Sequence, residues 1–311
     1  MRVYLDCFPC FLRQTLDAIR SVTGDEKVHE EVVRQVLELM CRTDAHRTPP
    51  AIGQEIHRVI RRVTGNPDPY RQRKHDSNVL AMRLYPQLNE RIRNSSNRLE
   101  TAVRLAIAGN IIDFGLYSSL EAADVTEAID RALADDWDAG CLEEFAQAVN
   151  DARSILYIGD NAGEIVFDRL LIEELPQEKM TYAVKGSPVL NDATMEDAEM
   201  TGLTRLVKVV ENGSDAPGTI LEACSAGFRE HFEQSDLITA KGQGNYECLN
   251  EVRKDMFFIL MAKCPVIAAD LGCDMGQMIL RRSRLANRAI HRDREEQTDA
   301  IPENPCYSGA E

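Results

Sequence analysis

The stretch Ser154-Ile-Leu-Tyr-Ile-Gly-Asp-Asn161 decides the fold class, because an apolar run ends there abruptly in a glycine and two polar residues. Four further runs follow the same plan, at TYAVKG (181–186), TRLVKVVENG (204–213), SDLITAKGQG (235–244) and CPVIAADLG (264–272). Helical patterns lie between them, at 164–175, 193–201, 217–225 and 246–262. A repeated order of strand, polar loop and helix predicts an α/β fold, with a mostly parallel sheet and helices on both faces. The run MFFIL at 256–260 fits either a strand or a buried helix.

The first 150 residues predict helices instead. Apolar residues recur at steps of three and four along 8–19 and 32–40, which is the spacing of one helix face. Proline-rich segments at 48–50 and 65–69 predict turns or loops. We therefore expect a helical domain over 1–150 and an α/β domain over 151–290, followed by a polar, flexible tail over 291–311.

Composition narrows the class of protein. The 36 basic and 51 acidic residues give a net charge of −15, which disfavours the phosphate neutralisation that sequence-independent nucleic-acid binding needs. No stretch approaches the roughly 18 consecutive apolar residues of a membrane span, and Asp6 interrupts any secretory signal. Nine irregularly spaced cysteines argue against a disulfide framework. We expect a soluble, cytoplasmic protein that binds neither nucleic acid nor a membrane, and the oligomeric state stays open.

Polar side chains follow each predicted strand. They are Asp160 and Asn161, Lys185 with Asn191 and Asp192, Asn212, the segment 241–245, and Asp270. Ligands of open α/β sheets bind outside the carboxyl ends of the strands. These side chains are therefore expected to converge on one edge of the sheet and to form a site there.

Three of these residues suggest a metal. Asp160, Asn161 and Asp192 offer hard oxygen donors without a neighbouring cysteine or histidine, a set that suits Mg²⁺ or Mn²⁺ better than zinc. The alternative is helix capping, because Asn161 stands three residues before Glu164 and Asp192 precedes another predicted helix. Two such positions on adjacent loops favour the metal.

The segment Lys241-Gly-Gln-Gly-Asn245 suggests a phosphate. Gly242 and Gly244 would let backbone N–H groups turn toward an anion, and Lys241 would add a positive charge. An ordinary tight turn is the alternative. The chain contains neither G-x-x-x-x-G-K-[ST] nor G-x-G-x-x-G after the first strand, so a phosphate without a nucleotide is the reading that remains.

Two pairs outside the predicted sheet are further candidates. Asn110 and Asp113 share one helix face and would close the pocket, unless they only mark a helix end. Cys7 and Cys10 form a CxxC at a helix start, where the helix dipole would lower a thiol pKa. No second ligand pair for zinc accompanies them, so a structural or redox use stays open.

Taken in order, five segments resemble a known family. They are AGNIIDFG (108–115), GDNAGE (159–164), VKGSPVLNDAT (184–194), ENGSDAPGT (211–219) and KGQGNYE (241–247). They resemble the metal-dependent damage-control phosphatases, once called domain of unknown function 89. The resemblance runs from Cys7 to about Gly276, and the CxxC looks like the prokaryotic branch.

The resemblance implies a three-layer α/β/α sandwich with a helical N-terminal domain. It also implies a divalent metal (Mn²⁺, Co²⁺, Ni²⁺ or Mg²⁺) held by Asp160, Asn161 and Asp192. The segment with Lys241, Gly242, Gly244 and Asn245 matches the family's phosphate side, and the segment with Asn110 and Asp113 matches one expected to line the pocket. Glu164 is a candidate for a substrate contact or for supporting the ligands.

Hydrolysis of a small phosphomonoester, such as a sugar phosphate or another phosphorylated metabolite, is thus the expected function. In that reaction Asp160 is either the attacking group or only a ligand, and Lys241 offsets developing charge. A methyltransferase that uses S-adenosylmethionine is an alternative with the same architecture. A binding module for a metal or for thiol redox chemistry at Cys7 and Cys10 is another.

Overall fold

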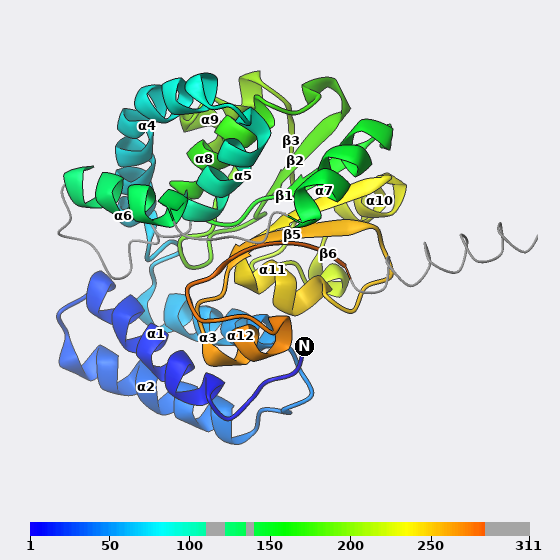
Figure 1. The fold of residues 1–311 in the computed structure, drawn as a ribbon. Coiled ribbons are helices and arrows are strands. Elements are labelled where there is room, and N and C mark those ends of the chain that lie inside the picture. The colour runs from blue at the N-terminus through cyan, green and yellow to red at the C-terminus, as the bar shows by residue number, and fades with distance from the viewer. Residues whose placement is uncertain (110–121, 135–139, 284–311) are drawn as a thin grey trace, which may run out of the picture.

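The computed structural model describes residues 1–109, 122–134 and 140–283 (Figure 1). Its centre is a six-stranded sheet in the order β3-β2-β1-β4-β5-β6. The first five strands are parallel and β6 joins the edge antiparallel to β5. The strands are β1 (Ile155–Ile158), β2 (Met180–Val184), β3 (Lys208–Glu211), β4 (Leu237–Lys241), β5 (Met256–Met261) and β6 (Met278–Arg282). The predicted mostly parallel α/β sheet is confirmed.

Helices cover both faces of this sheet (Figure 1). Tyr157 and Phe257 face a core shared with α4, α5, α7 and α8. Leu156 and Phe258, one position along, face a second core shared with α10, α11 and α12. Alternate residues of one strand thus face opposite cores, which is why β1 and β5 are apolar throughout.

The chain forms twelve α-helices in its described part. They are α1 (Cys7–Val22), α2 (Glu26–Cys41), α3 (Pro49–Thr64), α4 (Arg71–Asn94), α5 (Arg98–Ala108), α6 (Ala122–Ala134), α7 (Gly140–Asp151), α8 (Glu164–Ile172), α9 (Met195–Met200), α10 (Ala226–Gln234), α11 (Gly242–Leu249) and α12 (Pro265–Leu271). The first three enclose an apolar core of their own, lower in Figure 1 than the sheet. None of the described helices has the length and apolarity needed to cross a bilayer.

Two elements predicted in the last part of the α/β region, at 264–272 and 246–262, are wrong. The run 264–272 is not a strand, because Pro265 begins helix α12, where its fixed φ suits the first turn. The helix predicted over 246–262 ends at Leu249, and the apolar run at 256–260 belongs to β5. Asp270 therefore lies on α12, where its carboxylate accepts a hydrogen bond from the Tyr246 hydroxyl at 2.5 Å.

Other boundaries also differ from the prediction. Pro49 and Pro50 do not form a turn but begin α3, in the positions where a helix tolerates proline. The helix predicted at 217–225 is reduced to one 3₁₀ turn, Leu221–Ala223, and α10 follows it. The antiparallel strand β6 had no expected counterpart in the sequence. The predicted tail lies outside the described residues.

Candidate active site

The order of the strands reverses between β1 and β4, since β2 and β3 continue to one side and β5 to the other. Parallel α/β sheets bind ligands at such a point, where the loops that leave two neighbouring strands part and open a crevice. Asp160 follows β1 here and Gly242 follows β4. The predicted convergence of these two loops is thus what the structure shows.

Gly242 and Asp160 lie in direct contact. Gly242 has φ of +79°, and a Cβ atom on it would lie 1.8 Å from Asp160 Oδ2. Only glycine combines this backbone conformation with room for the carboxylate. Burial, and then the carboxylates of Glu164 and Asp192, raise the pKa of Asp160 well above its ordinary value. Asp160 keeps some exposure while most of its neighbours in sequence are buried, so solvent reaches it.

Asn161 and Asp192 form a backbone bridge between the two loops. Beside it, the Ala193 N–H donates to the Asp160 carbonyl at 2.8 Å. The Asn161 amide nitrogen donates to Asp160 Oδ2 at 3.1 Å and to Glu164 Oε1 at 2.9 Å. Since the nitrogen is turned to these carboxylates, the amide oxygen is the ligand that Asn161 can offer.

The capping alternative is wrong for both residues. Helix α8 has Gly163 at its N-cap, and α9 has Thr194. Asn161 instead uses its side chain on Asp160 and Glu164. Asp192 forms an ion pair with Lys185, at 3.3 Å between Oδ2 and Nζ. Neither side chain therefore caps the helix that follows it.

A buried network of polar side chains lies between the sheet and the residues at its carboxyl edge. Lys241 Nζ lies 2.9 Å from Asp168 Oδ1 and 3.2 Å from Glu164 Oε2. The hydroxyls of Tyr157 and Tyr182 donate to the two oxygens of Asp168, at 2.8 and 2.7 Å. Burial, and next the Asp168 carboxylate, raise the pKa of both tyrosines, so the hydroxyls stay protonated and able to donate.

Lys241 lies beneath the edge and not on it. Its side chain is 0% exposed, and its ammonium group is held by two carboxylates. Burial alone lowers its pKa, but Asp168 and Glu164 outweigh that effect and raise it, so the charge is retained. Because Lys241 also holds Glu164, which accepts from Asn161, it orients a candidate ligand from behind.

The expected glycine-rich loop is the first turn of a helix. Lys241 is the N-cap of α11, and Gly242 and Gly244 lie in its first turn. The first N–H groups of a helix lack partners within the helix, so this end suits an anion. Asn245 is committed elsewhere, since it donates to the carbonyls of Gly159 and Lys241 and accepts from Thr219. Asn245 therefore joins the ends of β1 and β4 to the segment that contains Thr219.

One residue of the site, Asp168, was missed as a candidate. Asp168 stands four positions after Glu164 on the mostly apolar helix α8, and this spacing on one face was a usable signal. The Lys185 ammonium contacts Asp192 and also donates to the Gly218 carbonyl. Lys185 was noted at the predicted edge, but its pairing with Asp192 depends on how two loops fold and has no sequence signal.

The donor set fits a divalent cation. The carboxylates of Asp160, Glu164, Asp168 and Asp192 lie together with the ammonium groups of Lys185 and Lys241, and Lys263 also acts on Asp160. Carboxylate oxygens are the donors that Mg²⁺ and Mn²⁺ prefer. Among the described residues no three His, Cys, Asp or Glu side chains form a ready metal site. The Asn161 amide oxygen would therefore have to complete the set.

The remaining candidates lie elsewhere. Asn110 and Asp113 fall outside the described residues. Cys7 begins α1 as predicted, but burial raises the pKa of Cys7 and of Cys10, in opposition to the expected effect of the helix dipole. Cys264 is a nearby third thiol, close enough to affect both. No observation here supports a reactive thiolate at the CxxC.

Comparisons with known proteins agree with this geometry. A sequence model of the damage-control phosphatase ARMT1-like domain matches residues 3–279. Protein MJ0202 of Methanocaldococcus jannaschii is 36% identical over 295 residues, covering 90% of this chain and 95% of that protein. Damage-control phosphatase PH1575 of Pyrococcus horikoshii is 34% identical over 289 residues (91% and 99%). A damage-control phosphatase of Archaeoglobus fulgidus is 31% identical over 287 residues (90% and 99%).

A solved structure extends the likeness to the fold. The crystal structure of PH1575, described as a DUF89 family protein, matches with a TM-score of 0.83 at 32% identity, over 91% of this chain and 100% of that one. The names of two relatives support a phosphatase function for this chain. The resemblance inferred from the five segments is confirmed, and the chain belongs to the family of the damage-control phosphatase ARMT1-like domain.

Proposed function

We propose that this chain is a metal-dependent phosphatase that hydrolyses small phosphomonoesters, of the class of sugar phosphates and related phosphorylated metabolites. One observation carries the proposal. Asp160, Asn161 and Asp192 come together where β1 and β4 part, beside the N-terminus of α11. This arrangement offers oxygen donors for a cation and backbone N–H groups for a phosphate at one edge of the sheet.

The parts of the site divide the work. A bound divalent cation would polarise the phosphoryl oxygens, and Asp160, Asn161 and Asp192 would hold it. The first-turn N–H groups of α11 would bind the phosphoryl oxygens and offset their charge. Lys185 keeps Asp192 in place, and Lys241 keeps Glu164 and through it Asn161. We therefore assign Lys241 to positioning the ligands and not to touching the phosphate.

Asp160 has two roles open to it. Its carboxylate either attacks the phosphorus or only binds the cation. Rapid-quench trapping separates these roles, since direct attack leaves an acyl phosphate on Asp160 and the ligand role does not.

The test is phosphate release from a panel of sugar phosphates and an aryl phosphate. Chelator-treated protein is resupplied with Mn²⁺, Co²⁺, Ni²⁺ or Mg²⁺, one metal at a time. Asp160→Asn and Asp192→Asn are compared with Glu230→Gln, an exposed carboxylate on α10. We expect metal-dependent release that falls about 10²- to 10³-fold in the two site variants, the scale for loss of a preorganised electrostatic group.

Glu230→Gln should release phosphate at the wild-type rate. If folded protein releases none with any metal, the phosphatase proposal is wrong, and calorimetry with S-adenosylmethionine becomes the next experiment. Release without added metal that chelation leaves unchanged would contradict the metal dependence alone.

A further inference from the structure

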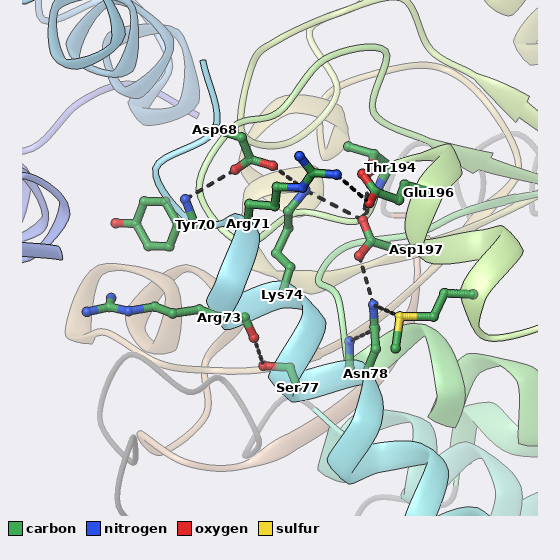
Figure 2. A network of polar contacts seen from close by, with 12 residues as sticks. Asp68, Tyr70, Arg71, Arg73, Lys74, Ser77, Asn78, Thr194, Glu196 and Asp197 are labelled. Atoms are coloured by element: carbon green, nitrogen blue, oxygen red, sulfur yellow. Dashed lines mark hydrogen bonds and ion pairs between the residues drawn. The ribbon is translucent and has the colours of Figure 1, made fainter. Parts of the chain in front are cut away.

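Helix α4 passes behind the two loops that carry the candidate ligands. Two of its residues, Lys74 and Asn78, contact Asp197 of α9, and we call these three residues the α4 network (Figure 2). All three side chains are buried, and Asn78 is 0% exposed. None of them belongs to the sequence segments that suggested the site, except that α9 follows Asp192 closely in the chain.

Asn78 joins the two loops through one amide group. Its oxygen accepts from the Gly163 N–H at 2.7 Å, and its nitrogen donates to Asp197 Oδ1 at 2.8 Å. These partners fix the orientation of the amide, because an N–H only donates and a carboxylate only accepts. An amide is thus required here, since neither a carboxylate nor an apolar side chain makes both bonds.

The contact at Gly163 is close. Gly163 has φ of +80°, and a Cβ atom on it would lie 3.0 Å from the Cβ of Ser77. The backbone of α4 therefore lies directly against the loop that begins with Asp160 and Asn161. A shift of α4 would move this loop, because no flexible side chain separates them.

Asp197 holds the other loop. Its Oδ2 accepts from the backbone N–H and from the hydroxyl of Thr194, both at 2.8 Å. Thr194 stands two residues after Asp192, and Ala193 between them donates its N–H to Asp160. Asn78 and Asp197 therefore connect the Asp160 loop and the Asp192 loop through a second route, on the side away from the bridge that joins them directly.

Lys74 balances the charge of this connection. Its ammonium group lies 2.9 Å from Asp68 Oδ2 and 3.6 Å from Asp197 Oδ2. The ammonium group is thus shared by the two carboxylates, and Asp197 also accepts hydrogen bonds from Asn78 and Thr194.

We propose that Asn78 and Asp197 are positioning residues that set the spacing of the Asp160 and Asp192 loops, and thereby set the affinity of the site for its divalent cation. The inference rests on the proposed function, because it assumes that these loops bind a cation. Outer partners of metal ligands commonly contribute 10- to 100-fold to metal affinity.

The test exchanges the two residues. Asn78→Asp places two carboxylates face to face, and Asp197→Asn turns an amide nitrogen toward the Asn78 nitrogen, so that two donors face each other. The double variant N78D/D197N restores this hydrogen bond with donor and acceptor exchanged. It keeps one oxygen for the Gly163 N–H and one for Thr194, and it leaves the net charge unchanged. Mn²⁺ affinity is measured from the electron paramagnetic resonance signal of free Mn²⁺, at a temperature where metal-free melting curves show every variant folded.

We expect each single variant to bind Mn²⁺ about 10- to 100-fold more weakly, and the double variant to recover to within about threefold of wild type. Ser77→Ala is the matched control, since its hydroxyl donates only to the Arg73 carbonyl within α4, and it should leave the affinity unchanged. If a single variant fails to fold, Thr194→Val removes one donor to Asp197 and should weaken binding about threefold, the scale of one hydrogen bond.

Lower melting temperatures with unchanged Mn²⁺ affinity would overturn the inference and leave a purely structural network. The same holds if the double variant binds as weakly as the single variants. If wild-type protein itself shows no Mn²⁺ binding that Asp192→Asn abolishes, the proposed function fails as well, so the two failures are told apart by the wild-type titration.

Discussion

The core of helices α1–α3 and the carboxyl edge of the sheet differ in how many charged side chains they bury. The core of the three helices is apolar, and His57, which is buried on α3, is neutral, since burial and then Arg61 lower its pKa to about 3. The charged side chains that are buried in the described part of the chain are Lys74, Glu164, Asp168, Lys185, Asp192, Asp197, Lys241 and Glu247. All except Glu247 belong to the β1–β4 edge or to the α4 network behind it.

This difference shows where the protein gives up stability for function. Burying an ion costs several kcal/mol unless partners compensate it, and an apolar core of the same volume is often as stable or more so. The core of helices α1–α3 is packed with apolar side chains and avoids this cost. The sheet edge keeps its buried ions, each with a partner of opposite charge or with hydrogen-bond donors, as expected for a site that must hold a cation in place.

Breaking a buried pair at the sheet edge should have the largest effect. Lys241→Met keeps the volume but leaves Glu164 and Asp168 buried without the ammonium group between them. We expect a loss of about 3–5 kcal/mol in the free energy of unfolding, measured by urea denaturation. A loss below about 1 kcal/mol would show that these carboxylates do not depend on Lys241.

Glu247 is the buried carboxyl outside this group, and its ionisation should lower the free energy of unfolding instead of raising it. Burial raises its pKa to about 7, although a hydrogen bond from Gln243 opposes the shift. Between about pH 4.5 and pH 7 the folded protein thus holds a proton that the unfolded chain releases, so stability falls as the pH rises through this range. Glu247→Gln cannot ionise and should gain at most about 3 kcal/mol at pH 8 and nothing near pH 4.

Urea denaturation at several pH values tests this prediction. The stability difference between Glu247→Gln and wild type should appear only above the ordinary carboxyl range. An equal difference at pH 4 and pH 8 would mean that the effect comes from packing and not from ionisation.

Gly242→Ala tests the contact on which the geometry of the site depends. The methyl group would be forced into Asp160, and a non-glycine residue at this positive φ is strained by about 1–2 kcal/mol. A carboxylate displaced by about 1 Å should slow phosphate release about 100-fold. Gly227→Ala on α10 is the control, because nothing lies within 4 Å of its Cβ and its φ is ordinary. Equal activity of the two variants would contradict the role of Gly242.

The smallest effect is expected at the exposed ion pairs of the three-helix unit. Arg58 of α3 contacts Asp215 at 2.7 Å, but its side chain is 54% exposed and Arg61 binds the same carboxylate. Arg58→Met should therefore change the free energy of unfolding by less than about 1 kcal/mol. A loss as large as that of Lys241→Met would remove the contrast between the two regions.

The sequence predicted those parts of the fold that depend on local pattern. The runs that became β1, β2, β3 and β4 end in glycine or polar residues, and these endings also located Asp160, Asn161 and Asp192. The pattern failed where an apolar run suits more than one element. MFFIL became β5 through pairing with β4 and β6, which is not encoded locally, and PVIAADL became α12, which begins at Pro265.

The candidate site was predicted for residues in the segments that follow the strands, such as Asp160, Asn161 and Asp192. Asp168 was missed although its spacing from Glu164 was a signal. Asn78 lies on a helix that gave no sign of a site, and its role arises from its contact with the loop at Gly163. Lys241 was predicted to add a positive charge toward a phosphate, yet its side chain is buried and contacts Glu164 and Asp168. Long-range contacts of this kind have no periodic signal in the sequence.

The central claim is that the β1–β4 edge holds a divalent cation. The most direct measurement is a crystal structure of the protein with Mn²⁺, with diffraction data collected on both sides of the manganese absorption edge. We predict one strong anomalous peak within bonding distance of Asp160, Asn161 and Asp192 oxygens, and its loss in Asp192→Asn crystals grown under the same conditions. A crevice without a peak at saturating Mn²⁺, or a peak bound elsewhere on the protein, would contradict the account.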